Sequence, residues 1–372
     1  MLVASSLTGD LIVVSVALVT IVIVYCKWTY QYWARRNVPY FQPQIPYGNL
    51  KKTLRGKEHI GVSLAKIYSD MKHKGWKYGG IYIFTKPSFF PTDLDIIRNI
   101  MTKDFHHFVD RDVFYNEKDP LQAHLLNLSG TKWRNLRAKL TPTFTSGKMK
   151  MMFNVMAECQ SDLYKRMDKE CEKREPINIK EILACFTTNI IGSCAFGLEF
   201  KALEDENSEF RKIGRKMFTS SRWLRWKRTF STTFPKVAKV LDLSMSRPEI
   251  AGFVMNMVEK TIDYREKNKV TRNDFMQLMI NLKNNKPTNP GDHDGKPLTM
   301  DEVASQCVVF FGAGFETSST LMTFALYELA KNEDIQERVR NEINSALKKY
   351  DNQITYDSIQ DIGYLNQVID GE

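Results

Sequence analysis

Residues 311–320 read Phe-Gly-Ala-Gly-Phe-Glu-Thr-Ser-Ser-Thr, and they lie inside an apolar run that extends from Val303 to Ala330. Thr299 and Glu302 come just before this run at the spacing of a capping box, in which two side chains satisfy free backbone N–H groups at a helix start. The pattern therefore predicts one long core helix around which the rest of the chain is organised.

The centre of this helix carries residues that a buried helix has no ordinary reason to contain. Glycine in a helix interior costs about 1 kcal/mol relative to alanine, and both Gly312 and Gly314 are present. Glu316 brings a carboxylate, which is costly to bury unless another group pairs with it or uses it. Residues 317–320 all carry hydroxyl groups. These residues predict a functional site, and a buried helix with a packing glycine and satisfied hydroxyls is the alternative.

The spacing suggests how such a site would be built. Ala313 and Gly314 come four and three residues before Thr317, which predicts that all three share one helix face. Two small side chains leave room for a flat ligand, and the Thr317 hydroxyl can donate to the Ala313 carbonyl and loosen the helix there. With the carboxylate of Glu316 beside it, this groove suits a small polar molecule that must receive protons in a dry pocket.

The sequence Ala313-Gly314-Phe315-Glu316-Thr317 resembles the oxygen-binding motif A/G-G-x-D/E-T in the central helix of cytochrome P-450 monooxygenases. Residues 310–320 and 325–330 resemble the insect microsomal branch, which is associated with xenobiotic metabolism. The resemblance implies a mainly α fold with a small β portion. It also implies that Thr317 hydrogen-bonds bound oxygen, that Glu316 helps to relay protons, and that Ala313 and Gly314 leave room beside the haem plane.

A second motif supports the same family. Trp133 and Arg137 are four residues apart and share a helix face, where the arginine could pair bidentately with a carboxylate. Trp133-x-x-x-Arg137 resembles the family's W-x-x-x-R motif, which contacts the haem propionates, and residues 136–149 again look like the insect branch. A surface Trp–Arg stack is the alternative.

Composition limits the other classes of function. The chain has 372 residues, of which 43% are hydrophobic, and a net charge of +10. No block of Lys and Arg is long enough to indicate nucleic-acid binding, so the charge suits acidic lipid or an acidic protein. The resemblance implies an electron-donating partner, the NADPH–cytochrome P-450 reductase, with cytochrome b5 as a second candidate and a small apolar substrate. The six cysteines show no C-x-x-C pair, and we expect reduced thiols.

The N-terminus predicts a membrane anchor. Residues 11–26 are uncharged and rich in Val, Ile and Leu, which suits the thin endoplasmic reticulum bilayer. Aromatic residues follow as in an interfacial belt, and the basic residues Lys27, Arg35 and Arg36 predict a body that faces the cytoplasm. We expect a transmembrane signal anchor at 1–27 and an aromatic and proline-rich hinge at 28–50.

The remaining segments are interpreted coarsely. Residues 79–84 predict a strand that pairs with 87–90, and 104–127 predict a structured loop, which in the family shapes the substrate pocket. Residues 210–248 are aromatic and basic; they suit either pocket-roof helices that touch lipid or a helix pair that buries its aromatics. Residues 284–298 predict a mobile loop.

The family's fold continues with an E-x-x-R motif and a loop F-x-x-G-x-R-x-C-x-G, whose cysteine ligates the haem iron. Gly371 stands where the resemblance expects that glutamate, and none of the six cysteines, Cys194 included, lies in the second pattern. We therefore expect 51–372 to be a partial cytochrome P-450 domain, incomplete at the C-terminus, without a haem-ligating cysteine and without retained haem b.

Two functional hypotheses follow. By resemblance, the chain is a haem-thiolate monooxygenase that oxidises small apolar substrates with O2 and electrons from NADPH. The alternative is an inactive membrane-tethered fragment that binds no haem and arises from a retained intron, a gene-model error or a truncated allele.

Overall fold

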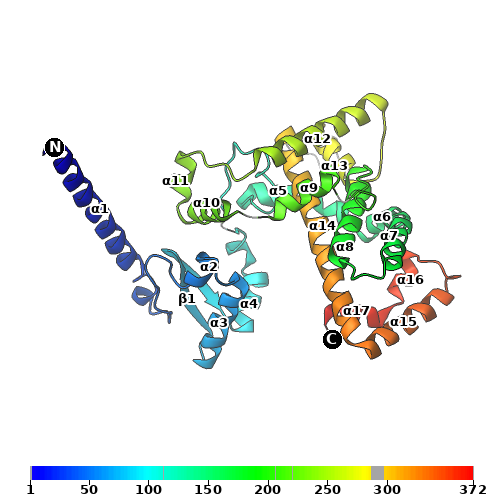
Figure 1. The fold of residues 1–372 in the computed structure, drawn as a ribbon, viewed down its shortest axis with the longest axis horizontal. Coiled ribbons are helices and arrows are strands. Elements are labelled where there is room, and N and C mark those ends of the chain that lie inside the picture. The colour runs from blue at the N-terminus through cyan, green and yellow to red at the C-terminus, as the bar shows by residue number, and fades with distance from the viewer. Residues whose placement is uncertain (1, 112, 206, 220, 286–296, 372) are drawn as a thin grey trace. The chain divides into compact units, whose positions relative to one another are not determined.

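Most of the chain is helical, and the strands of the described residues form one small sheet, as expected. The structure is a computed structural model, and it describes residues 2–111, 113–205, 207–219, 221–285 and 297–371. The chain folds as two units (Figure 1). Unit 1 consists of Met1–Arg111 with Thr229–Leu241, and unit 2 consists of Asp112–Arg228 with Asp242–Glu372.

Unit 1 combines the N-terminal helix with a hairpin and short helices. Its elements are α1 (Leu2–Thr29), η1 (Ala34–Arg36), α2 (Lys51–Leu54), α3 (Ile60–His73), β1 (Tyr78–Ile83), β2 (Lys86–Pro91), α4 (Leu94–Arg98), η2 (Asn99–Lys103), η3 (Phe105–His107) and α11 (Pro235–Val240). The helix α10 (Arg222–Thr233) runs from unit 2 into unit 1.

The hairpin confirms the predicted pair of strands. Strands β1 and β2 are antiparallel, with Tyr78 opposite Pro91 and Ile83 opposite Lys86. A Cβ at Gly80 would lie 2.4 Å from ring atoms of Trp33, so only glycine lets this indole lie against the strand. Trp33 also donates from its ring nitrogen to the Ile81 carbonyl, at 3.2 Å. The hinge segment is therefore packed onto the sheet.

This packing corrects one expectation about the aromatic belt. Tyr30 and Trp33 were expected at the membrane interface with their neighbours, but both are buried in a cluster with Cys26 and Tyr82. The Tyr82 hydroxyl donates to the Tyr30 carbonyl at 2.9 Å, which satisfies a polar group inside the cluster. Trp28 remains exposed and suits an interfacial position.

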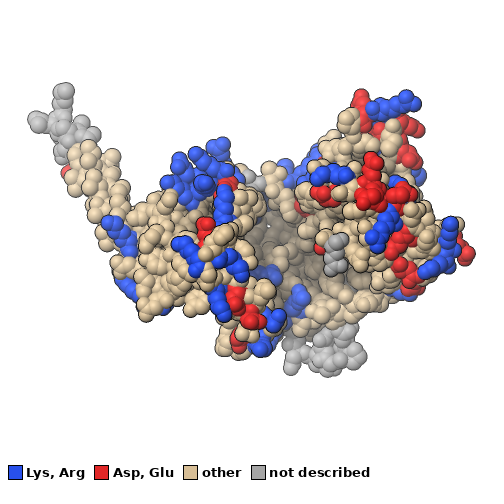
Figure 2. All heavy atoms as spheres, turned by 90° about the horizontal axis from the view of Figure 1, so that it is seen from below, with Lys and Arg blue, Asp and Glu red and all other residues tan. Residues whose placement is uncertain are grey.

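The N-terminal helix stands out from the rest of unit 1. The span 9–36 is apolar, only 6% of its most hydropathic window is buried, and its length suits a membrane crossing. Figure 2 shows that the drawn part of this helix is almost free of charged side chains. Elsewhere on the face in Figure 2, Lys and Arg are interspersed with Asp and Glu, which agrees with a distributed charge.

Unit 2 is helical. Its elements are α5 (Gly130–Leu140), η4 (Thr141–Phe144), α6 (Ser146–Glu158), α7 (Gln160–Glu172), α8 (Ile179–Ile191), η5 (Gly192–Phe196), α9 (Glu209–Phe218), α12 (Pro248–Asn268), α13 (Phe275–Lys283), α14 (Met300–Lys331), α15 (Glu333–Lys348), α16 (Tyr356–Gln360) and α17 (Gly363–Asp370).

The predicted long helix is α14, and it organises unit 2 (Figure 1). Its capping box is confirmed, because Thr299 and Glu302 accept each other's backbone N–H groups at 2.9 and 3.2 Å. Helix α8 packs along α14, and α12 and α13 pack near its N-terminal half. The largest buried cluster contains Val303, Ala304, Cys307, Phe311 and Phe315 of α14.

The two interpretations of residues 210–248 are now distinguishable on α10. Trp223 and Trp226 stack with ring centroids 6.5 Å apart, yet they are 70% and 59% exposed. The alternative in which these aromatics are buried is therefore wrong for this pair. The predicted loop at 284–298 lies mostly outside the described residues.

Candidate active site

The candidate site lies in unit 2, at the middle of α14. The Thr317 hydroxyl donates to the Ala313 carbonyl at 2.6 Å, as predicted from their spacing. Both residues are exposed, and residues four apart lie one above the other on a helix. We call Ala313 and Thr317 the site strip.

The site strip continues as an apolar face. Leu321 and Phe324 follow Thr317 by four and seven residues, and both are exposed. At the other end Phe310 stacks on Phe144, with centroids 5.3 Å apart. An apolar face with a narrow, small-residue centre suits a flat apolar ligand.

The two glycines beside the strip lie close to side chains of neighbouring helices. A Cβ at Gly314 would lie 2.5 Å from Cδ1 of Ile191 on α8, and a Cβ at Gly312 would lie 3.0 Å from Cε of Met217 on α9. The expected shared face thus holds for Ala313 and Thr317 but not for Gly314. Glycine is required at 314 because α8 approaches α14 closely there. The part that the resemblance gives Gly314 beside the haem stays a prediction.

Glu316 turns toward α8. Its carboxylate lies 3.5 Å from Nζ of Lys180, and its side chain is one-quarter exposed. Burial lowers the pKa of Arg211 on α9, but Glu181, which accepts from its guanidinium at 2.9 and 3.0 Å, raises this pKa, and the charge of Glu316 adds a smaller rise. Glu316 therefore belongs to a network of charges between α8, α9 and α14, which connects the helix beside Thr317 with solvent at Lys180.

The Glu181 carboxylate of this network is expected to affect stability in acid. Burial raises its pKa, but hydrogen bonds from Arg211 and Arg215 outweigh burial and lower the pKa from 4.5 to about 2. Such a group stabilises the fold above its unfolded pKa and loses this contribution as the pH falls toward its folded pKa. We expect the free energy of unfolding to fall more steeply between about pH 4.5 and pH 2 in the wild type than in Glu181→Gln. Denaturant unfolding at each pH measures these slopes.

The matched control is Glu259→Gln, because Glu259 is an exposed carboxylate on α12. This variant should follow the wild-type slope. Equal slopes for Glu181→Gln and the wild type would contradict the role assigned to Glu181.

Trp133 and Arg137 lie on α5, which Leu136 and Leu140 attach to the core. The Arg137 side chain is exposed, and no residue in the described part of the chain pairs with its guanidinium. Trp133 is half-buried on the same face, as the spacing predicted. An unpaired, pre-positioned guanidinium suits bidentate binding of a carboxylate.

Two features of the described residues suit parts of a haem, namely its flat ring and its acidic edge. The site strip offers a flat apolar face, and Arg137 offers a cation for an acidic edge. Burial raises the pKa of Cys194 to about 12 and the pKa of Cys307 further. A thiol with such a pKa stays protonated, whereas iron binds the thiolate. Among the described residues, no cluster of three His, Cys, Asp or Glu side chains could hold a metal.

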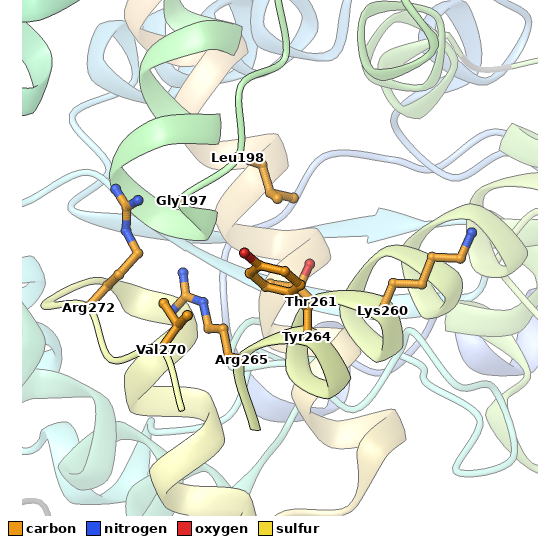
Figure 3. A pocket seen from close by; sticks show the side chains of 8 residues that line it. All are labelled: Gly197, Leu198, Lys260, Thr261, Tyr264, Arg265, Val270 and Arg272. Carbon is orange, nitrogen blue, oxygen red and sulfur yellow. The ribbon is translucent and has the colours of Figure 1, made fainter. Parts of the chain in front are cut away.

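A cavity of about 380 Å³ in unit 2 contains none of the predicted site residues. It is lined by residues of the turn after η5, of α12 and of the segment that leads into α13, among them Thr261, Tyr264 and Arg265 (Figure 3). Arg265 is buried and donates to Asp274 at 2.8 and 2.6 Å and to the Phe196 carbonyl at 2.9 Å. These hydrogen bonds of Arg265 join α12 to the end of η5 and to the start of α13. Arg265 therefore has a structural role in this cavity.

Sequence reasoning missed the polar residues that hold the site's surroundings. Gln306 is fully buried in α14 and bonds to the loop that precedes α5. Asp119 in that loop is buried and accepts from Met245 and Ser246. A glutamine inside an otherwise apolar run was a signal for Gln306, whereas Asp119 sits in a polar loop that gave none.

Comparison with known proteins supports the resemblance. The family model described as cytochrome P450 matches residues 42–370. The chain is 39% identical to cytochrome P450 6a8 of Drosophila melanogaster over 367 residues, which is 98% of this chain and 72% of that protein. It is 39% identical to cytochrome P450 6A1 of Musca domestica, with 95% of this chain and 69% of that protein covered. It is 41% identical to cytochrome P450 6a2 of Drosophila melanogaster, with 91% and 68% covered.

Proposed function

Because the chain belongs to the cytochrome P450 family of haem monooxygenases, we propose that it inserts oxygen into small apolar substrates such as xenobiotics or lipophilic metabolites. The family takes its electrons from NADPH–cytochrome P450 reductase. We assign the distal side of the site to the site strip and the haem edge to Arg137 and Trp133. The single observation that carries this proposal is the exposed strip of Ala313 and Thr317 at the middle of α14, where the Thr317 hydroxyl bonds back to the Ala313 carbonyl.

Arg137 would bind and orient the prosthetic group by its carboxylate edge. Its planar guanidinium can donate two parallel hydrogen bonds to one carboxylate, which fixes direction as well as charge. Trp133 contributes a flat ring on the same helix face. The prosthetic group bound there would supply oxygen activation and transfer to a substrate carbon, in the chemistry typical of haem with a thiolate ligand.

Thr317 holds a proton at the reacting face. In the structure its hydroxyl donates to the Ala313 carbonyl, and rotation about one bond would let it donate to a group above the strip instead. Ala313 carries only a methyl group, so this space is not filled by the helix itself. Phe310 and Phe324 border the strip and would keep it dry, which strengthens a hydrogen bond made there.

Glu316 is the candidate for supplying a new proton to the Thr317 hydroxyl. It sits next to Thr317 in sequence and faces Lys180, whose side chain is exposed. A carboxylate that reaches both an interior helix and an exposed ammonium group can pass protons inward when its ion pair opens. Cytochrome b5 is a further candidate partner.

The apolar helix α1 would anchor the protein in a membrane, and we propose the endoplasmic reticulum, with the body facing the cytoplasm. Lys27, Arg35 and Arg36 follow the apolar span, which favours this orientation by the positive-inside rule. The exposed pair Trp223 and Trp226 on α10 would be a second contact with lipid, because indole rings prefer the headgroup region.

A carbon monoxide difference spectrum of the full chain in microsomes tests the proposal. We expect bound haem in the wild type, and the spectrum shows which kind of ligand holds its iron. Arg137→Ala should retain about tenfold less haem per protein, because it loses a charge-assisted pair, and a pyridine haemochrome assay would measure this.

Arg134→Ala is the matched control for Arg137→Ala, because Arg134 is an exposed arginine on the same helix but not on the face of Trp133. It should retain haem like the wild type. A wild-type chain that shows neither band nor haem would refute the monooxygenase proposal and support the inactive, membrane-tethered alternative.

A further inference from the structure

The irregular segment before α5, residues 113–129, is fastened to the core by three side chains that the proposed chemistry does not use. We call it the α5 loop. Ser305 and Gln306 hold it to α14, and Asp119 holds it to the segment before α12. Leu121 anchors it in the core cluster.

The amide of Gln306 pairs with the loop as a neighbouring strand would. Its nitrogen donates to the Ala123 carbonyl at 2.9 Å, and its oxygen accepts from the Leu125 N–H at 3.1 Å. The second N–H donates to the Glu302 carbonyl of its own helix at 3.1 Å. Each polar function of the buried amide is therefore satisfied, and no other side chain of this size offers both a donor and an acceptor in this arrangement.

Two further contacts fix the same loop. Ser305 is fully buried and donates to the Pro120 carbonyl at 2.8 Å. One carboxylate oxygen of Asp119 accepts from the Ser244 hydroxyl and from the backbone N–H groups of Met245 and Ser246, each at 2.8 Å. Burial raises the pKa of Asp119, but these donors outweigh burial and hold it below its usual value.

Gln306 lies on the same face of α14 as the site strip, so the α5 loop that it holds lies on that face too. Ala313 and Thr317 follow Gln306 by seven and eleven residues, which are two and three helical turns, so all three lie on one face of α14. At 1.5 Å per residue, Gln306 is about 10 Å along the axis from Ala313. The loop segment held by Gln306 therefore covers the same helix face, directly before the site strip begins.

We infer that Gln306 is a positioning residue: through its amide it holds the α5 loop across the face of α14, where the loop closes one end of the substrate site. The closing of the substrate site rests on the proposed function, whereas the hold of Gln306 on the α5 loop does not. Loss of the amide would leave the carbonyl of Ala123 and the N–H of Leu125 without their partner in a partly buried place, which favours an open loop.

The first test is hydrogen–deuterium exchange on the full-length chain. Gln306→Met keeps the length of the side chain and removes every hydrogen bond of the amide. We expect the backbone amides of 120–128 to exchange at least about tenfold faster. Gln306→Glu keeps an acceptor for the Leu125 N–H but loses both donors. Its exchange rate at 120–128 should therefore lie between those of the wild type and Gln306→Met.

Thr187→Val is the matched control. Thr187 is buried on α8 and donates to the Phe315 carbonyl of α14 at 2.8 Å, so this variant also removes a buried hydrogen bond to α14, away from the loop. Its exchange at 120–128 should match the wild type. Unchanged exchange at 120–128 in Gln306→Met, or equally faster exchange throughout unit 2, would overturn the inference.

The second test uses the haem-containing enzyme with an alkoxycoumarin as apolar probe. A loosened end wall should raise the KM of Gln306→Met about tenfold and change the ratio of products, while kcat stays within about threefold. A faster-exchanging loop with unchanged KM and product ratio would refute the loop as a wall of the site. A wild type without turnover would refute the proposed function, and the exchange data would still decide the role of Gln306 in the loop.

Discussion

Replacing Asp274 with alanine is expected to destabilise unit 2 by about 3–5 kcal/mol, because it leaves a buried guanidinium without its counter-charge. Asp274 and Arg265 have side chains only 6% and 3% exposed, and they share two hydrogen bonds of 2.8 and 2.6 Å. Asp274 also caps α13 by accepting from the Gln277 N–H at 2.9 Å, and loss of a cap adds about 1 kcal/mol. Denaturant unfolding followed by circular dichroism would measure the change.

The exposed pair of Lys150 and Asp357 is the control for Asp274. It also joins two helices of unit 2, at 2.9 Å, but both side chains are more than half exposed. Asp357→Ala should therefore cost less than about 1 kcal/mol. The double change Asp274→Leu with Arg265→Met should cost less than Asp274→Ala alone, because no charge stays buried. Equal costs for Asp274→Ala and Asp357→Ala would contradict the assignment.

Replacing Thr317 with valine should separate oxygen consumption from product formation. Valine keeps the shape of threonine and loses the hydroxyl that donates to Ala313. Proton delivery by a positioned group is worth about 100-fold or more in rate, so the haem-containing variant should form at least about tenfold less product per oxygen consumed. An oxygen electrode with product analysis measures this ratio, and the haem content per protein should stay.

Thr317→Ser retains a hydroxyl at the same place and should keep most of the coupling. Ser318→Ala removes the neighbouring exposed hydroxyl, which points about 100° away around the helix axis, and should behave like the wild type. If Thr317→Val couples oxygen to product as well as Thr317→Ser does, the hydroxyl is not part of proton delivery.

Local patterns in the sequence were sufficient for the elements that depend on neighbouring residues. The capping box of Thr299 and Glu302, the length of α14 and the pairing of β1 with β2 were all predictable. The bond from Thr317 to Ala313 was predictable for the same reason, since it spans one helical turn. Each of these features depends on residues that are close together in the sequence.

Contacts between distant helices were not predictable in this way. Spacing indicated that Gly314 would be open, but the approach of Ile191 depends on how α8 crosses α14. The partner of Glu316 is Lys180, more than a hundred residues earlier, and no periodicity connects them. Buried Trp33 and exposed Trp223 look alike in the sequence, because composition does not reveal which surface another element will cover.

The crowding around α14 limits how the catalytic repertoire could be redesigned. Directed evolution toward larger or differently shaped substrates would seek space at the three small residues 312–314, but Gly312 and Gly314 each already have a neighbouring side chain at 3.0 Å or less from any added Cβ. Ala313 is the one of the three that faces open space. A mutant library directed at this helix should therefore keep both glycines and place its diversity at Ala313, Leu321 and Phe324.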